Sequence, residues 1–133
     1  MNLQLLIAAI LAAIGVGIGA LGSHSMPGYL AAKGFDEAKI EKRLEQCETG
    51  VRYQLIHSLA VVAISLSSAA RERRGFRVAS WFMIAGIILF SGSIYGIVFF
   101  EAPTHVIVPF GGLSFIAGWI ALAIVAFRSA KEA

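Results

Sequence analysis

The chain has 133 residues, of which 58% are hydrophobic and only 14% charged, and its formal net charge is +3. A soluble globular domain averages about 25% charged residues, so this composition excludes that class and favours a membrane protein. The positive charges flank apolar segments, where they orient a membrane protein, and we therefore expect no nucleic-acid partner.

The chain contains four long apolar segments, each with an uncharged run of about 18 to 23 residues. At ~1.5 Å rise per residue, a helix of this length crosses a hydrocarbon core of ~30 Å. Helices satisfy their backbone groups internally, so we expect an all-α membrane protein with four transmembrane helices in a single integral membrane domain, 1–133. We place these helices at about 3–22, 51–70, 78–100 and 106–127.

The first helix is expected to be retained rather than cleaved as a signal peptide, because its start carries no Lys or Arg. Glycine and proline in residues 22–28 predict a turn after it. The polar segment that follows predicts an amphipathic helix at about 36–50, since apolar residues recur from Ile40 to Val51 at spacings of four, three and four. This helix is too polar to span, and we expect it to lie at the membrane surface.

The connection between the second and third transmembrane helices is dense in arginine, at Arg71, Arg73, Arg74 and Arg77. Positively charged short loops stay in the cytoplasm, so we expect both termini of the four-helix protein on that side. The same arginines suit contact with anionic lipid, although topology signalling explains them equally well.

The expected topology places several polar side chains at the membrane side opposite the arginine loop. These pocket candidates are His24, Glu48, Tyr53, His57, Ser91 and Tyr95. Unpaired polar groups facing lipid cost several kcal/mol, so we expect these side chains to point inward and bond to one another. Two interpretations stay open: hydrogen bonds that fasten the helices together, or a pocket for a small ligand, a proton path or a metal.

Small residues recur at helical spacings in three of the four predicted transmembrane helices. The candidates for helix packing are Gly15, Gly19, Gly92, Gly96, Gly111, Ser114 and Gly118. Small stripes let backbones approach closely in lipid, where packing drives association. We therefore expect a compact four-helix bundle.

Five stretches, which together extend over nearly the whole chain, carry a family pattern. They are Gly19–His24, Glu48–Ala60, Leu89–Tyr95, Pro109–Gly112 and Gly118–Trp119. As a set they resemble the YgdD-like family of small bacterial inner-membrane proteins, whose animal relatives are called transmembrane protein 256. The resemblance implies four transmembrane helices, a place in the bacterial inner membrane and an unassigned molecular function.

The residues favour a non-enzymatic protein, because the sequence has no glycine-rich phosphate loop and no paired carboxylates inside an apolar segment. The lone Cys47 excludes a Cys-x-x-Cys metal site, and we name no cofactor. We expect a structural or accessory subunit of a membrane complex, whose partners are the lipid bilayer and either a membrane protein or a second copy. The alternative is a small transporter or channel with a pocket lined by His24, Tyr53 and His57. A further alternative is a metal or small-ligand site in that pocket.

Overall fold

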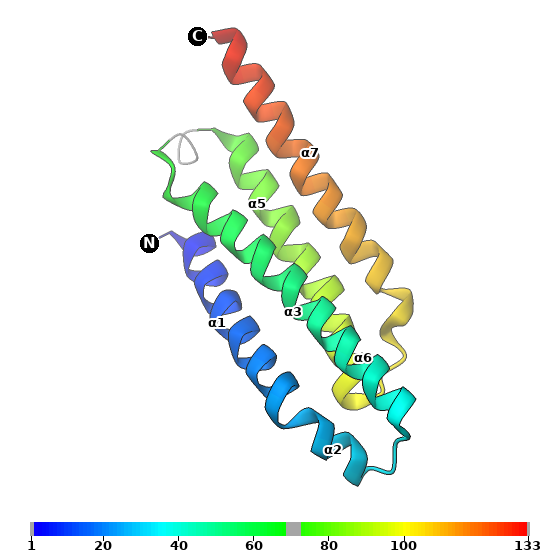
Figure 1. The fold of residues 1–133 in the computed structure, drawn as a ribbon. Helices are drawn as coiled ribbons and strands as arrows, with labels where there is room; N and C mark the ends of the chain where they lie inside the picture. Colours follow the sequence, from blue (N-terminus) through cyan, green and yellow to red (C-terminus); the bar gives the residue numbers. More distant parts are fainter. Residues whose placement is uncertain (1, 69–72, 133) are drawn as a thin grey trace.

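The computed structural model describes residues 2–68 and 73–132, and nearly all of them are helical. The long helices are α1 (Leu3–His24), α3 (Glu37–Leu66) and α7 (Val108–Glu132). A fourth rod is built from α5 (Arg74–Gly86), the π-helical η1 (Ile87–Gly92) and α6 (Ser93–Phe100). Two short helices are α2 (Met26–Ala32) and the 3-10 helix η2 (Thr104–Val106). Figure 1 shows the rods side by side, with both chain ends near the end of the bundle where α3 leads to α5.

Helix α1 starts at an Asn2 cap, whose side-chain oxygen accepts a hydrogen bond from the Leu5 N–H at 3.2 Å. The sequence predicts a turn over residues 22–28, but α1 continues to His24 and α2 begins after one intervening residue. Proline in the first turn of α2 explains this, because its missing N–H would have no helical partner there. The glycines and the proline therefore bend the helical path without opening a loop.

Helix α3 is one continuous helix of 30 residues, capped by the Asp36 carboxylate that accepts from the Lys39 N–H at 2.8 Å. The sequence instead divides this stretch into a surface helix at 36–50 and a transmembrane helix at 51–70. Gly50 does not interrupt the helix. The apolar residues of its first half face the bundle and pack with α2 and α6, so the predicted amphipathic pattern is present within a longer rod.

The rod made of α5, η1 and α6 extends from Arg74 to Phe100, which starts four residues before the predicted 78–100 helix. It ends at Glu101, whose positive φ of 54° places it in the left-handed region. The Ala102 N–H then bonds to the Gly96 carbonyl at 3.0 Å, which is the usual way a helix end satisfies a carbonyl. This tight end turns the chain back toward α7.

Two apolar clusters lie at opposite ends of the bundle. One is centred on Val61, Ile64, Met83 and Ile84 near the chain termini, and the other on Met26, Leu30, Cys47, Ile94 and Val98 near α2. α3 contributes to both clusters and is the central rod, packed on one side by α1 and on the other by the α5–α6 rod. Side chains of its middle section therefore have neighbours on several sides.

Three helices among the described residues are long and apolar enough to cross a membrane: Leu3–His24, Arg74–Phe100 and Thr104–Arg128. The all-helical class is thus confirmed, whereas the expected number of four crossings is not. α3 is missing from this group because the apolar half of the helix contains Arg52, Gln54 and His57. Arg71, one of the four arginines used for the expected orientation, lies outside the described residues.

Candidate functional site

The middle of the bundle contains a group of hydrogen-bonded polar side chains, which we call the polar belt. Its members are Gln54, His57, Ser91, Tyr95 and Trp119, and Gln54 of α3 is at its centre. Gln54 is only 2% exposed. Its Nε2 donates to the Leu11 carbonyl of α1 at 2.6 Å, and its Oε1 accepts from the Tyr95 hydroxyl of α6 at 2.7 Å. One side chain thus joins three helices.

Ser91 provides a second link between the rods. Its fully buried hydroxyl donates to the Gly50 carbonyl of α3 at 2.8 Å. Gly50 also allows close approach of the Tyr95 ring, since a Cβ at position 50 would lie 2.9 Å from the Tyr95 Cε1. Gly50 therefore acts as a contact surface for η1 and α6.

His57 forms the third link, between α3 and α7. Its Nδ1 lies 2.7 Å from the Tyr53 carbonyl, and the Trp119 Nε1 donates to its Nε2 at 3.1 Å. An indole nitrogen can only donate, so Nε2 must accept and the proton is on Nδ1, which donates to the carbonyl. This arrangement selects the neutral imidazole and uses both of its nitrogens.

Aromatic rings surround His57 on the face where α3, η1 and α7 meet. The imidazole stacks on Phe115 with centroids 3.6 Å apart and planes at 13°. Tyr53, which is 41% exposed, lies at the edge of this group with its ring centroid 4.6 Å from that of Phe90. Stacking at these distances adds to the hydrogen bonds in holding the three elements together.

We expect Trp119→Phe to lower the free energy of unfolding by about 1 kcal/mol, the usual value for a hydrogen bond between membrane helices. The phenyl ring keeps most of the packing, while His57 Nε2 loses its donor. Reversible unfolding in mixed detergent micelles measures the difference. Trp81→Phe is the matched control, because Trp81 is 46% exposed and no hydrogen bond of its indole is seen among residues 2–68 and 73–132. Equal destabilisation by the two variants would contradict the assigned role of Trp119.

The belt lies at mid-length of the bundle, between the two apolar clusters, and not at one end as expected from the sequence. On α1 it is level with Leu11, which is close to the middle of that helix. The difference arises because α3 begins at Glu37, so His57 is far from its start. Polar groups at this depth need protein partners, and the belt provides them.

His24 is not part of this belt. It is exposed at the end of α1. Gly22, two residues before it, lies against Cys47, where an added Cβ would be 3.2 Å from the Cys47 Sγ. His57 is ten residues farther along α3, which corresponds to roughly 15 Å of helix. The pocket or pathway expected between His24, Tyr53 and His57 is therefore not formed.

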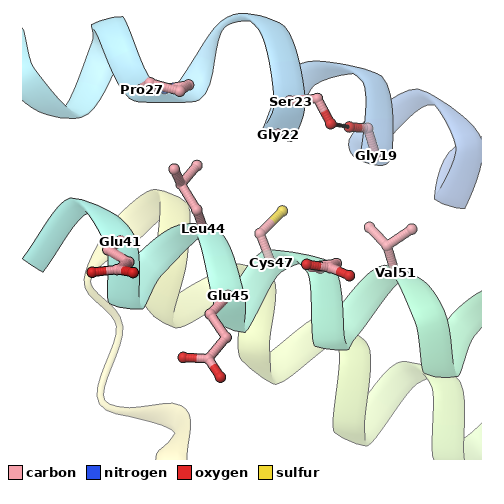
Figure 2. A pocket seen from close by; sticks show the side chains of 10 residues that line it. Gly19, Gly22, Ser23, Pro27, Glu41, Leu44, Glu45, Cys47 and Val51 are labelled. Carbon is pink, nitrogen blue, oxygen red and sulfur yellow. Dashed lines mark hydrogen bonds between the residues drawn. The ribbon is translucent and has the colours of Figure 1, made fainter.

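Glu48 is likewise outside the belt and lines a groove of about 410 Å³ between α1, the start of α2 and the first half of α3. Its carboxylate pairs with Arg52 at 2.7 Å, and both side chains are exposed. Figure 2 shows the Cys47 thiol pointing from α3 toward Gly22, with Glu41 and Glu45 also on the α3 side of the groove.

The predicted packing residues fall into two groups. On α1, Gly15 and Gly19 face Leu55 and Val51 of α3. On α7, Gly111, Ser114 and Gly118 face the α5–η1 part of the fourth rod, and the Ser114 hydroxyl donates to the Phe82 carbonyl at 2.8 Å.

Two of the predicted glycines have different surroundings. Gly96 faces Thr104 and Ala102 of the adjoining turn, where a Cβ would be 3.2 Å from the Thr104 Oγ1. Gly92 has open space where a side chain would be, with nothing within 4 Å. Neither contributes to packing between the long rods.

Gln54 and Trp119 of the belt, and Phe115 that stacks on His57, are not among the residues predicted from the sequence. The sequence predicts Tyr53 on the inward face of α3, whereas its neighbour Gln54 is buried and Tyr53 lies at the edge. Adjacent helical positions differ by about 100° around the axis, so a small error in rotation exchanges the two residues. The signal available was a glutamine within an apolar segment, which needs partners wherever it is buried.

As placed, the belt fastens helices together. Gln54, Ser91, Tyr95 and His57 all have partners on a neighbouring rod. Over the described residues, no group of three or more His, Cys, Asp or Glu side chains is arranged to hold a metal ion. The interpretation of the polar residues as interhelical fasteners is the one that these contacts favour.

Comparison with known proteins gives a consistent set of relatives. Residues 18–112 match the family model described as Protein of unknown function (DUF423). A UPF0382 membrane protein of Haemophilus influenzae is 40% identical over 103 residues, which is 77% of this chain and 82% of the relative. The UPF0382 membrane protein YwdK of Bacillus subtilis is 32% identical over 96% of this chain and 98% of its own length. The UPF0382 inner membrane protein YgdD of Escherichia coli is 32% identical over 97% of this chain and 92% of its own. No solved structure matches the chain.

Proposed function

The chain belongs to the DUF423 family, whose relatives above are named as membrane proteins, and from this premise we propose that it is a non-enzymatic accessory protein that docks to another membrane helix through α1. The resemblance to the YgdD-like proteins is confirmed by these relatives. Their names state no molecular function, so the proposal is built from the geometry of the chain.

We place four crossings in this protein, with α3 as the second. Support comes from the connectivity: α1 ends at the α2 end of the bundle and α5 begins at the opposite end, so the chain between them must traverse the bundle. The polar residues of α3 are compatible with this, because Gln54 and His57 are buried and bonded to α1, α6 and α7. Arg52 is exposed beside Glu48 and can reach the interface.

We also place both termini in the cytoplasm. Arg73, Arg74, Arg77 and Arg128 lie at the end of the bundle that holds both termini. At the opposite end, Lys39 faces Glu101 at 4.0 Å and Arg43 donates to the Ile97 carbonyl at 2.6 Å. The closely spaced arginines favour the cytoplasmic side for their own end.

The observation that carries the docking proposal is an unoccupied small-residue stripe on α1. Only 11% of the apolar window of α1 is buried inside the bundle, against 44% for the α5–α6 rod. Ala9, Ala13 and Gly17 are exposed at spacings of four, and a Cβ at Gly17 would have nothing within 4 Å. This stripe is separate from the inward glycines of α1 that contact α3. Exposed small residues at such spacing let a second helix approach closely in lipid.

A photo-crosslinking amino acid at Ala13, in intact membranes, tests the proposal. We expect an adduct with a second copy or with another membrane protein. The same group at Ile116, which is 56% exposed on α7, is expected to crosslink to lipid only. Equal yields of protein adduct from the two positions, or no protein adduct from Ala13, would contradict docking through α1.

We expect Gly17→Leu to weaken this association by about tenfold or more, because the added side chain separates the two helix backbones. Gly112→Leu is the matched control, since a Cβ there also has nothing within 4 Å. Both variants should fold as the wild type does. The measurement is the fraction of protein in the crosslinked species, with the Ala13 photo-crosslinker present in each variant.

A further inference from the structure

A second groove, of about 520 Å³, lies between the start of α5 and the last part of α7. Its lining extends from Ala121, two residues beyond Trp119 on α7, toward the end of the bundle that holds the termini. Its lining residues are Arg73, Arg74, Gly75, Val78, Ala121, Ile124, Val125 and Arg128. A cavity of this size is in the range that holds a small-molecule ligand.

The lining is divided into a cationic part and an apolar part. Arg74 and Arg128 come from different helices, and both are exposed. Val78 and Ile124, 39% and 47% exposed, continue the groove along the helices. The two helices touch beside it, because a Cβ at Gly75 would collide with Val125. The groove therefore offers charge at one end and an apolar wall at the other.

The electrostatic surroundings strengthen the cationic part. Arg73, the cap residue of α5, supplies no side-chain acceptor to the first turn of the helix. The positive end of the helix dipole thus adds to the charge of the guanidinium groups.

We infer that this groove binds an anionic phospholipid, with its phosphate held by Arg74 and Arg128 and the start of an acyl chain along Val78 and Ile124. Guanidinium groups match phosphate oxygens in a bidentate geometry. Basic pockets between helices at the cytoplasmic side of a membrane are suited to acidic head groups. The divided lining favours a lipid over free phosphate, because only an amphiphile uses both parts.

The test is a titration of the full chain in an uncharged detergent, read by native mass spectrometry. The probes are dioleoyl phosphatidylglycerol, dioleoyl phosphatidylcholine with the same acyl chains, and inorganic phosphate. We expect one phosphatidylglycerol molecule to bind to each chain more tightly than any further ones. Phosphatidylcholine should bind more weakly, and inorganic phosphate should not displace the bound lipid. Displacement by inorganic phosphate would overturn the lipid assignment, and equal binding of the two lipids would overturn the role of charge.

The variant Arg74→Gln/Arg128→Gln is expected to bind phosphatidylglycerol about 25-fold more weakly, which is about fivefold for each arginine. Arg77→Gln is the matched control for the single variant Arg74→Gln: each removes one charge from α5, but Arg77 does not line the groove. Its affinity is expected to change by about twofold or less, because an exposed charge outside the site is screened by salt. Equal weakening by Arg74→Gln and Arg77→Gln would mean that the lipid is attracted only by the overall positive charge of this end, and it would overturn the site.

The apolar half of the groove has its own variant. Val78→Glu places a carboxylate along the expected acyl chain, and it should weaken the binding of both phospholipids. Unchanged binding would contradict the assigned position of the chain. Thermal unfolding without added lipid checks that each variant folds, and the two single arginine variants, each expected to be about fivefold weaker, carry the test if the double variant is unstable.

Discussion

Gly111→Ala is expected to destabilise the bundle by about 3 kcal/mol, a value at the upper end for overpacking of a tightly packed interior. A Cβ at position 111 of α7 would lie 2.7 Å from the Phe90 Cα in η1. Backbone atoms cannot move aside as the end of a flexible side chain can. Phe90 is further held because its ring packs on Tyr53 and Phe115. α7 would have to move away from η1, which disturbs the contact of His57 with Phe115 and Trp119.

Gly112→Ala provides the control for this experiment, one residue farther along the same helix. A Cβ at Gly112 has nothing within 4 Å. Replacing glycine by alanine within a helix is worth up to about 1 kcal/mol, so Gly112→Ala should leave stability unchanged or slightly increased. Reversible unfolding in mixed detergent micelles compares the two variants. Destabilisation of equal size would show that the close approach of α7 and η1 is not what Gly111 permits.

Gln54→Ala is expected to have a similarly large effect, a loss of about 2 to 4 kcal/mol. The substitution removes two interhelical hydrogen bonds, leaves the Tyr95 hydroxyl without its acceptor and opens a cavity at the centre of the bundle. Gln4→Ala is the control, because the Gln4 amide also donates to a backbone carbonyl, that of Arg77 at 2.9 Å, but in an exposed position. Its loss should cost less than about 1 kcal/mol.

A double-mutant cycle separates the hydrogen bond from the cavity. Gln54→Leu keeps most of the side-chain volume, and Tyr95→Phe removes only the hydroxyl. The coupling between them is expected to be about 1 kcal/mol in favour of the native pair. Additive effects, with no coupling, would mean that the 2.7 Å contact between the Tyr95 hydroxyl and the Gln54 Oε1 contributes no net stability.

The helical class of the fold could be predicted from the sequence because it depends on long runs of local composition. The small-residue stripes on α1 and α7 are predictable for the same reason, since spacings of three and four identify one helical face. The π-helical turn at Ile87–Gly92 could not be predicted, because it depends on how Ser91 and Phe90 fit between α3 and α7. Such turns have no distinct local pattern.

The polar belt was predictable only in part. Ser91, Tyr95 and His57 could be selected because polar groups in apolar segments need partners. Their depth could not, since it depends on where α3 begins and on Gly50, which lies within the continuous helix and is a contact surface for Tyr95. Because the sequence places a helix start at residue 51, it predicts that His24 and His57 lie close together. The continuous α3, which begins at Glu37, separates them.

The belt also has a consequence for how the chain is made. On the four-crossing arrangement, α3 is the rod least able to partition into lipid by itself. Its Gln54 finds the Leu11 carbonyl on a helix already synthesised, but the Tyr95 hydroxyl emerges from the ribosome later and the Trp119 indole later still. Nascent chains that stop short of α7 would therefore keep the His57 Nε2 without its donor within the bilayer, so the last helix completes the burial of α3.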